Sequence, residues 1–143
     1  MVENKKGFES IPTGTENVLV VDDEERAVSI MKAVLERLGY NVTAMTSSLK
    51  AMELFKEDPH QFDLVLTDLI MPQLNGDKLV SEIIEIRPDM PVIITSGFTD
   101  TIANDNFKQI SNKAFISKPF QPQELAKTVR QVLDRNVSIK SDL

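Results

Sequence analysis

Short apolar runs alternate along the chain with longer segments in which apolar residues recur every three or four positions. The short runs have the length and composition of strands, and the longer segments have the periodicity of amphipathic helices. Strands are expected at Asn17–Val21, Asn41–Met45, Phe62–Thr67, Val92–Thr95 and Ala114–Ser117. Helices are expected at Glu24–Leu38, from Ser47 or Ser48 to Lys56, and at Asp77–Ile86, Thr101–Ile110 and Pro122–Leu133.

This alternation predicts an α/β fold with a parallel sheet. The strand at 62–67 is apolar almost throughout, as expected of a central strand that is covered on both faces. The strand at 41–45 is mixed in polarity, as expected of an edge strand. These polarities fit a flavodoxin-like, doubly wound, five-stranded sheet of order 2-1-3-4-5, with five helices in three layers. The pattern alone also permits a small Rossmann-like variant.

Polar segments at both ends limit the expected domain. Residues 1–16 are polar with interspersed glycine and proline, which predicts a flexible leader or linker. Residues 17–135 are expected to form one domain, and residues 136–143 a tail. Within the domain, Gly39 is expected to end the first helix, and Asp22 or Asp23 to cap its start.

The composition excludes several classes of protein. The chain has 143 residues, no cysteine and a net charge of −6. Disulfides, thiol catalysis and zinc–thiolate sites are therefore excluded, and the negative charge argues against direct nucleic-acid binding. No apolar stretch approaches the roughly 20 residues of a membrane span, and the first ten residues lack a signal-peptide core. A cytoplasmic location is expected.

Four of the apolar runs end on polar residues that suit phosphate chemistry. These residues are Asp22 and Asp23 after the first strand, Asp68 after the third, Ser96 after the fourth and Lys118 after the fifth. Parallel strands end at one edge of a sheet, which is where open α/β sheets bind ligands. Three carboxylates, a hydroxyl and an ammonium group are therefore expected to converge.

Each of these residues also has a plainer interpretation. Asp22 and Asp23 fit the oxygen ligands of Mg²⁺, but aspartates also cap helices. Asp68 can act as a nucleophile toward a phosphoryl group, because aspartate forms such covalent intermediates. Lys118 and Ser96 can contact phosphate oxygens. Considered one at a time, however, they are equally typical of a surface lysine and of a turn. Their occurrence at four strand ends favours the phosphate interpretation.

Taken in order, these residues and their neighbours resemble the receiver domain of two-component response regulators. The resemblance covers residues 17–135 and rests on Val20–Glu24, Leu66–Asp68, Met71–Pro72, Gly76, Pro91–Gly97 and Lys118–Phe120. It implies that Asp68 is the phosphoacceptor and that Asp22, Asp23 and the backbone carbonyl of Ile70 bind Mg²⁺ with it. Lys118 would contact the phosphate.

The resemblance also assigns a switch. Ser96 would be the switch hydroxyl, with Thr95 as the alternative at this position, and Phe115 the switch aromatic, with a core phenylalanine as the plainer interpretation. Phosphorylation would change the surface formed by the helix at 101–110, the fifth strand and the last helix. Family members usually have a cis peptide bond before the proline that corresponds to Pro119.

The implied function is signalling, with no turnover of a separate substrate. A histidine kinase, a phosphotransfer domain or a small phosphodonor would phosphorylate Asp68, and the signal would pass to a downstream protein or to a kinase core in the same chain. A phosphorylation-dependent dimer is left open. The leader resembles the linker before the C-terminal receiver of hybrid histidine kinases, so the chain is either such a segment or a stand-alone regulator.

Two other function classes are weighed against this interpretation. A haloacid-dehalogenase-type phosphohydrolase would need a second aspartate at the position of Ile70 and room for a cap domain. A pseudo-receiver would act only as an interaction module. Ile70 and Phe98 are apolar where family members often carry polar groups that can guide water. Slow loss of phosphate, over hours, is therefore expected.

Overall fold

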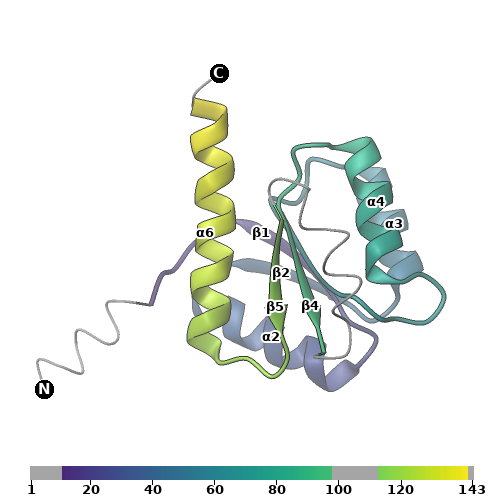
Figure 1. The fold of residues 1–143 in the computed structure, drawn as a ribbon, viewed down its shortest axis with the longest axis horizontal. Coiled ribbons are helices and arrows are strands. Elements are labelled where there is room, and N and C mark those ends of the chain that lie inside the picture. Colours follow the sequence, from purple (N-terminus) through teal and green to yellow (C-terminus); the bar gives the residue numbers. More distant parts are fainter. Residues whose placement is uncertain (1–10, 98–112, 142–143) are drawn as a thin grey trace, which may run out of the picture.

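A computed structural model gives the fold of this chain and describes residues 11–97 and 113–141. Five parallel strands form one sheet with helices on both faces (Figure 1). The strands are β1 (Asn17–Val21), β2 (Asn41–Met45), β3 (Leu64–Asp68), β4 (Val92–Ser96) and β5 (Lys113–Ser117). Their order is β2-β1-β3-β4-β5, which confirms the predicted doubly wound topology.

Four helices lie within the described residues. They are α2 (Glu25–Arg37), α3 (Ser48–Glu57), α4 (Gly76–Ile86) and α6 (Pro122–Ser141). The helix expected at 101–110 lies outside the described residues. Helix α6 continues beyond residue 135, into the segment that we had assigned to a tail, because no glycine or further proline interrupts it. None of the described helices is long and apolar enough to cross a bilayer.

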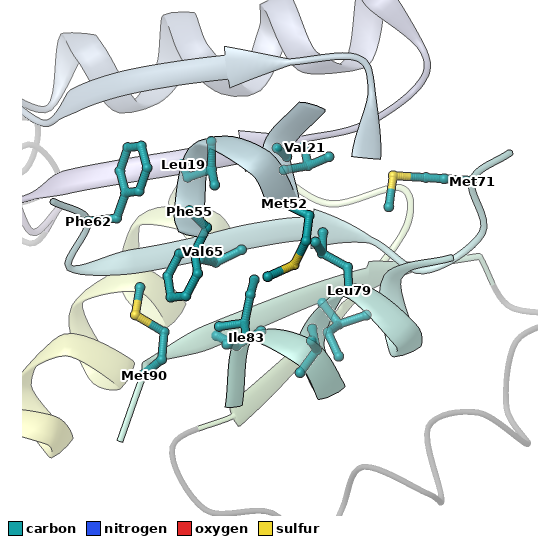
Figure 2. Packing of buried hydrophobic residues seen from close by; sticks show 14 of the residues in the cluster. Leu19, Val21, Met52, Phe55, Phe62, Val65, Met71, Leu79, Ile83 and Met90 are labelled. Carbon is teal, nitrogen blue, oxygen red and sulfur yellow. The ribbon is translucent and has the colours of Figure 1, made fainter. Parts of the chain in front are cut away.

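Two hydrophobic clusters hold the sheet in place, one on each face. Neighbouring strand residues belong to opposite clusters, because side chains alternate across a sheet. The first cluster packs α3 and α4 on the sheet (Figure 2) and includes Leu19, Phe55, Val65, Ile83 and Met90. The second packs α2 and α6 on the other face and includes Val20, Leu35, Leu66, Ile93 and Val129.

The starts of two helices test the expected caps. Ser47 is the cap of α3, and its side chain accepts a hydrogen bond from the backbone N–H of Lys50 at 3.2 Å. The expected aspartate cap of α2 is wrong, because Glu24 takes that position and makes no side-chain capping bond. Asp22 Oδ1 instead accepts the N–H of Glu24 at 2.9 Å. This bond holds one oxygen of Asp22 and leaves the other for the edge of the sheet.

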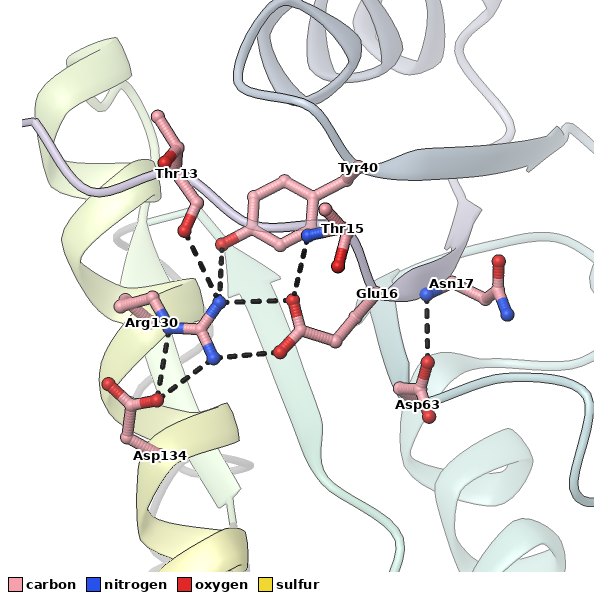
Figure 3. A network of polar contacts seen from close by, with 8 residues as sticks. All are labelled: Thr13, Thr15, Glu16, Asn17, Tyr40, Asp63, Arg130 and Asp134. Carbon is pink, nitrogen blue, oxygen red and sulfur yellow. Dashed lines mark hydrogen bonds and ion pairs between the residues drawn. The ribbon is translucent and has the colours of Figure 1, made fainter.

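The end of the leader is bound to the domain by Arg130 of α6 (Figure 3). Arg130 donates from Nη1 to Glu16 Oε1 at 3.0 Å and from Nη2 to Glu16 Oε2 at 2.7 Å. It also donates to Asp134 Oδ1 at 2.9 Å and to the carbonyl of Thr13 at 3.4 Å. A bidentate pair of this kind is directional and stronger than a single contact. Residues 13–16 are therefore docked, where we had expected flexibility.

The Arg130 network predicts a pH-dependent contribution to stability. The hydrogen bond to Arg130 lowers the pKa of Glu16 below its usual 4.5. A lowered carboxyl pKa stabilises the fold above pH 4.5, and this contribution is lost as pH falls through the lowered value. We expect Glu16→Gln to reduce stability at pH 7 by about 1 kcal/mol, or about 4 °C in Tm. Thermal unfolding followed by circular dichroism measures this change.

The control for this measurement is Glu53→Gln, which removes an exposed carboxylate from α3. It should change Tm by less than about 1 °C both at pH 7 and at pH 3, because substitutions of exposed residues that make no special contacts have small effects. The Glu16→Gln difference should shrink below pH 4. An equal loss of stability at pH 7 and at pH 3 would show that the ion pair does not cause it.

Candidate functional site

Three carboxylates meet at the carboxyl end of the sheet. Asp22 and Asp23 follow β1, Asp68 ends β3, and each offers an oxygen within 4.8 Å of the others. The parallel pairing of Val21 with Thr67 brings these strand ends side by side. Asp22 is buried, Asp68 is largely buried and Asp23 is exposed. The site is therefore anchored inside the protein and open on one side.

Lys118 bridges two of these carboxylates. Its Nζ lies 3.1 Å from Asp22 Oδ2 and 3.2 Å from Asp68 Oδ1, and only 29% of its side chain is exposed. Its backbone N–H donates to the carbonyl of Ser96 at 2.8 Å, which joins the ends of β4 and β5. The peptide bond between Lys118 and Pro119 is cis. Lys118 is thus part of the site and does not extend into solvent.

The charges at the site do not balance. Burial and the neighbouring Asp22 raise the pKa of Asp68 above its usual 3.8, and Lys118 offsets this only in part. Burial alone would lower the pKa of Lys118, but Asp22 and Asp68 together raise it. One ammonium therefore faces three carboxylates. A small divalent cation with oxygen ligands would relieve the excess negative charge, and this donor set fits Mg²⁺.

Two hydroxyl groups at the end of β4 are buried without a partner. Thr95 Oγ1 and Ser96 Oγ make no hydrogen bond within the part of the chain that the structure describes, and both residues are fully buried. A buried polar group without a partner costs roughly 1–3 kcal/mol. The backbone register pairs Thr95 with Asp68, while Ser96 binds Lys118 through its carbonyl. Thr95 and Ser96 are consecutive on β4, so their side chains point to opposite faces of the sheet. The carbonyl of Ser96 accepts from the Lys118 N–H, which places the backbone of Ser96 next to Lys118.

The backbone around Asp68 is fixed by residues whose contacts the sequence did not reveal. Thr67 Oγ1 donates to the carbonyl of Asp68 at 3.0 Å, and the N–H of Gly76 donates to the carbonyl of Leu69 at 2.7 Å. A side chain at Gly76 would collide with the Asp68 carbonyl and would lie 2.9 Å from the Leu69 Cα. Gly76 therefore sets the position of Asp68. In the sequence, Gly76 stood out as one of the residues that carry the family resemblance, but its contact with Asp68 was not foreseen.

Two of the remaining expected residues, Ile70 and Phe115, are described by the structure. Ile70 follows Asp68 by two residues and is exposed, with a relative accessibility of 56%. Phe115 on β5 is half-buried and packs against the first hydrophobic cluster. Phe98 lies outside the described residues. The structure thus places Phe115 between the core and the surface, the position that a side chain needs if it is to move.

The comparisons with known proteins agree with this geometry. A family model described as the response regulator receiver domain matches residues 18–130. The response regulator receiver protein CpdR of Brucella abortus (strain 2308) is 32% identical over 116 residues, which cover 81% of this chain and 94% of that protein. The crystal structure of a response regulator receiver domain protein from Clostridium thermocellum matches with a TM-score of 0.80 and 31% identity, covering 87% and 98% of the two chains.

Similar segments also occur in much longer proteins. The sensor kinase CckA of Brucella abortus (strain 2308) is 30% identical over 123 residues, which are 86% of this chain and 13% of the kinase. The two-component response regulator ARR12 of Arabidopsis thaliana is 32% identical over 140 residues, covering 94% of this chain and 23% of that protein. This chain therefore spans less than a quarter of either relative.

The crowded carboxylates predict that one charge at this site destabilises the fold. Because the pKa of Asp68 is raised in the folded state, the ionised carboxylate lowers the stability of the protein above pH 3.8. This stability is regained as pH falls through the raised pKa and Asp68 takes up a proton. We expect Asp68→Asn to raise Tm at pH 7, without divalent ions, by about 3 °C. Differential scanning calorimetry measures this gain, which should disappear near pH 3.

Two comparisons sharpen this test. Glu85→Gln, on the exposed side of α4, should leave Tm unchanged at both pH values. Excess MgCl₂ should raise Tm for the wild-type protein, because a ligand that binds only the folded state stabilises it, and should do so less for Asp68→Asn. A lower Tm for Asp68→Asn without divalent ions would contradict the predicted charge crowding.

Proposed function

Because this chain belongs to the response regulator receiver family, we propose that it accepts a phosphoryl group on Asp68 with Mg²⁺ and passes the signal to a partner protein. The single observation that carries the proposal is the contact of Lys118 with Asp68 inside a cluster of three carboxylates. The donor would be a phosphohistidine of a kinase or phosphotransfer domain, or a small phosphodonor. We expect it to work in the cytoplasm.

In the proposed reaction, a carboxylate oxygen of Asp68 attacks phosphorus and the bond from phosphorus to the donor breaks. Asp22, Asp23, Asp68 and the carbonyl of Ile70 would hold Mg²⁺, which when bound supplies positive charge against the incoming phosphoryl oxygens. Lys118 lies within reach of the same oxygens because it already contacts Asp68. Positioning and charge neutralisation are most of what this chemistry requires.

Phosphorylation would then act as a local switch. A phosphoryl group on Asp68 brings acceptor oxygens to a site where the hydroxyl of Ser96 is buried without a partner. Movement of Ser96 and Lys118 toward the phosphoryl group would shift β4 and β5 and change the packing of Phe115. The surface made by residues 101–110, β5 and α6 would pass this change on as a shift between two states.

The direct test is phosphorylation of the purified chain with acetyl phosphate and MgCl₂. Intact-mass spectrometry should show one added phosphoryl group on the wild-type protein and none on Asp68→Asn. Asp22 also contacts Lys118, but it is more deeply buried and its two oxygens already accept from Glu24 and Lys118. Ser96→Ala should still take up phosphate but lose most of the chemical-shift changes in β5 that NMR detects on phosphorylation. Thr95→Val should retain them if Ser96 is the switch hydroxyl.

The controls separate this function from its alternatives. Asp23→Asn should slow phosphorylation at least about tenfold, and a higher MgCl₂ concentration should restore part of the rate, because this exposed carboxylate is proposed to bind the cation. A wild-type chain that takes up no phosphoryl group would support the pseudo-receiver. Rapid turnover of acetyl phosphate without accumulation of modified protein would support a phosphohydrolase.

The lifetime of the phosphorylated state offers a further prediction. Ile70 is apolar and exposed next to the site, so its side chain cannot orient an attacking water. We expect phosphate to be lost over hours and Ile70→Asn to shorten this lifetime about tenfold, since a polar group can position the water. Ile86→Asn is the matched control, because Ile86 is also an exposed isoleucine, at the end of α4. Loss within seconds from the wild-type protein would contradict this expectation.

A further inference from the structure

The docked leader follows a fixed path along α2. The N–H of Gly14 donates to the carbonyl of Leu38 at 3.1 Å, just after α2 ends. A side chain at Gly14 would lie 2.6 Å from Arg130 Nη1 and would collide with the ring of Tyr40. Gly39, at φ 106°, faces the carbonyl of Gly14 with no room for a side chain. A side chain at Gly39 would clash with the backbone of the leader, and one at Gly14 would require Tyr40 or Arg130 to move.

This path leads the chain into an apolar groove. The groove has a volume of about 490 Å³, and Ile11 lies at it together with Ile30, Val34 and Leu38 of α2 and Pro122 at the start of α6. Ile30 is the most exposed large hydrophobic residue among those described, with a relative accessibility of 57%. Exposed apolar grooves of this kind commonly mark a binding surface.

We propose that this groove is the docking surface for the chain's own N-terminal segment, with Phe8 packed against Ile30. The leader passes Leu38 at Gly14 and reaches the groove by Ile11. Eight residues of helix separate Leu38 from Ile30, or about 12 Å. The three residues from Ile11 to Phe8 span up to about 10 Å when extended, so Phe8 can reach Ile30.

The charged residues of the leader also favour a path along α2 toward its start. Lys5 and Lys6 precede Phe8 by two and three residues. The start of α2, one to two turns beyond Ile30, carries the exposed residues Glu24 and Glu25. A segment that continues along α2 brings its two lysines to these acids at a distance where unlike charges attract. The exposed Arg26 offsets part of this attraction, so the apolar contact of Phe8 with Ile30 is what sets the proposed register.

This docking would make the leader an occupant of the α2 face beside the phosphoacceptor edge. It does not depend on phosphorylation of Asp68, because it rests on contacts at α2, α6 and the leader alone. A second copy of the chain could present its leader to the same groove. The test below separates that outcome from docking within one chain.

Disulfide trapping tests the proposal in the full chain, which has no cysteine of its own. Gly7→Cys is combined with Arg26→Cys, one helical turn from Ile30 on the same side of α2. The control combines Gly7→Cys with Ser81→Cys on the exposed side of α4. We expect diamide to form the first disulfide within one chain at least about tenfold faster than the second, because docking raises the effective concentration of the two thiols.

Additional variants in the Gly7→Cys and Arg26→Cys background identify the cause. Phe8→Ser should lower the rate to that of the control, and Phe8→Leu should restore most of it. Equal rates for the two cysteine pairs, or no effect of Phe8→Ser, would overturn the proposal. A disulfide that forms only between chains, seen as a dimer on a non-reducing gel, would overturn it in favour of a second copy. Neither the rate of disulfide formation nor the gel depends on phosphorylation of Asp68.

Discussion

The ion pairs of Lys118 with Asp22 and Asp68 are the constraint around which the site is organised. They join the ends of β1, β3 and β5, three strands that are separated widely in sequence. Carboxylates at these positions repel one another, and a single ammonium offsets only part of that repulsion. Lys118 therefore holds the strand ends together but leaves an excess of negative charge at the site. This excess favours binding of a cation, and it disfavours binding of a phosphoryl group when no cation is present.

The two hydrophobic clusters hold this charged site in place. Each buried strand contributes side chains to both clusters, so a strand cannot slide or rotate without disrupting packing on both faces. Gly76 and Thr67 then fix the backbone at Asp68 itself. Buried hydroxyls without a partner at the end of β4 have the opposite character, because they gain from any change that brings an acceptor near. The fold thus combines a closely packed backbone at Asp68 with a strand end whose buried hydroxyls lack hydrogen-bond partners.

The far end of the sheet is organised by a second charged group. Arg130 connects α6, Tyr40 and the leader, and the close approach of Gly14 to Gly39 fits the leader against α2. The leader and α6 are consequently attached to each other, although 114 residues separate Glu16 from Arg130. Any shift of α6 would therefore act directly on the docked residues 13–16 through the pair of Arg130 with Glu16.

The sequence by itself determined the α/β fold class and the four strand ends that carry the polar residues, and it favoured the order 2-1-3-4-5 while still permitting a Rossmann-like variant. These follow from local periodicity and from the rule that parallel strands end at one edge. It did not determine the docking of residues 13–16, the length of α6, the role of Gly76 or the failure of Asp22 to cap α2. These features depend on which groups, distant in sequence, approach each other in space. No local sequence pattern around Arg130 predicts that its partner is Glu16. Tertiary structure decided them because the hydrogen bonds, charge pairs and close contacts concerned form only once the sheet has been assembled.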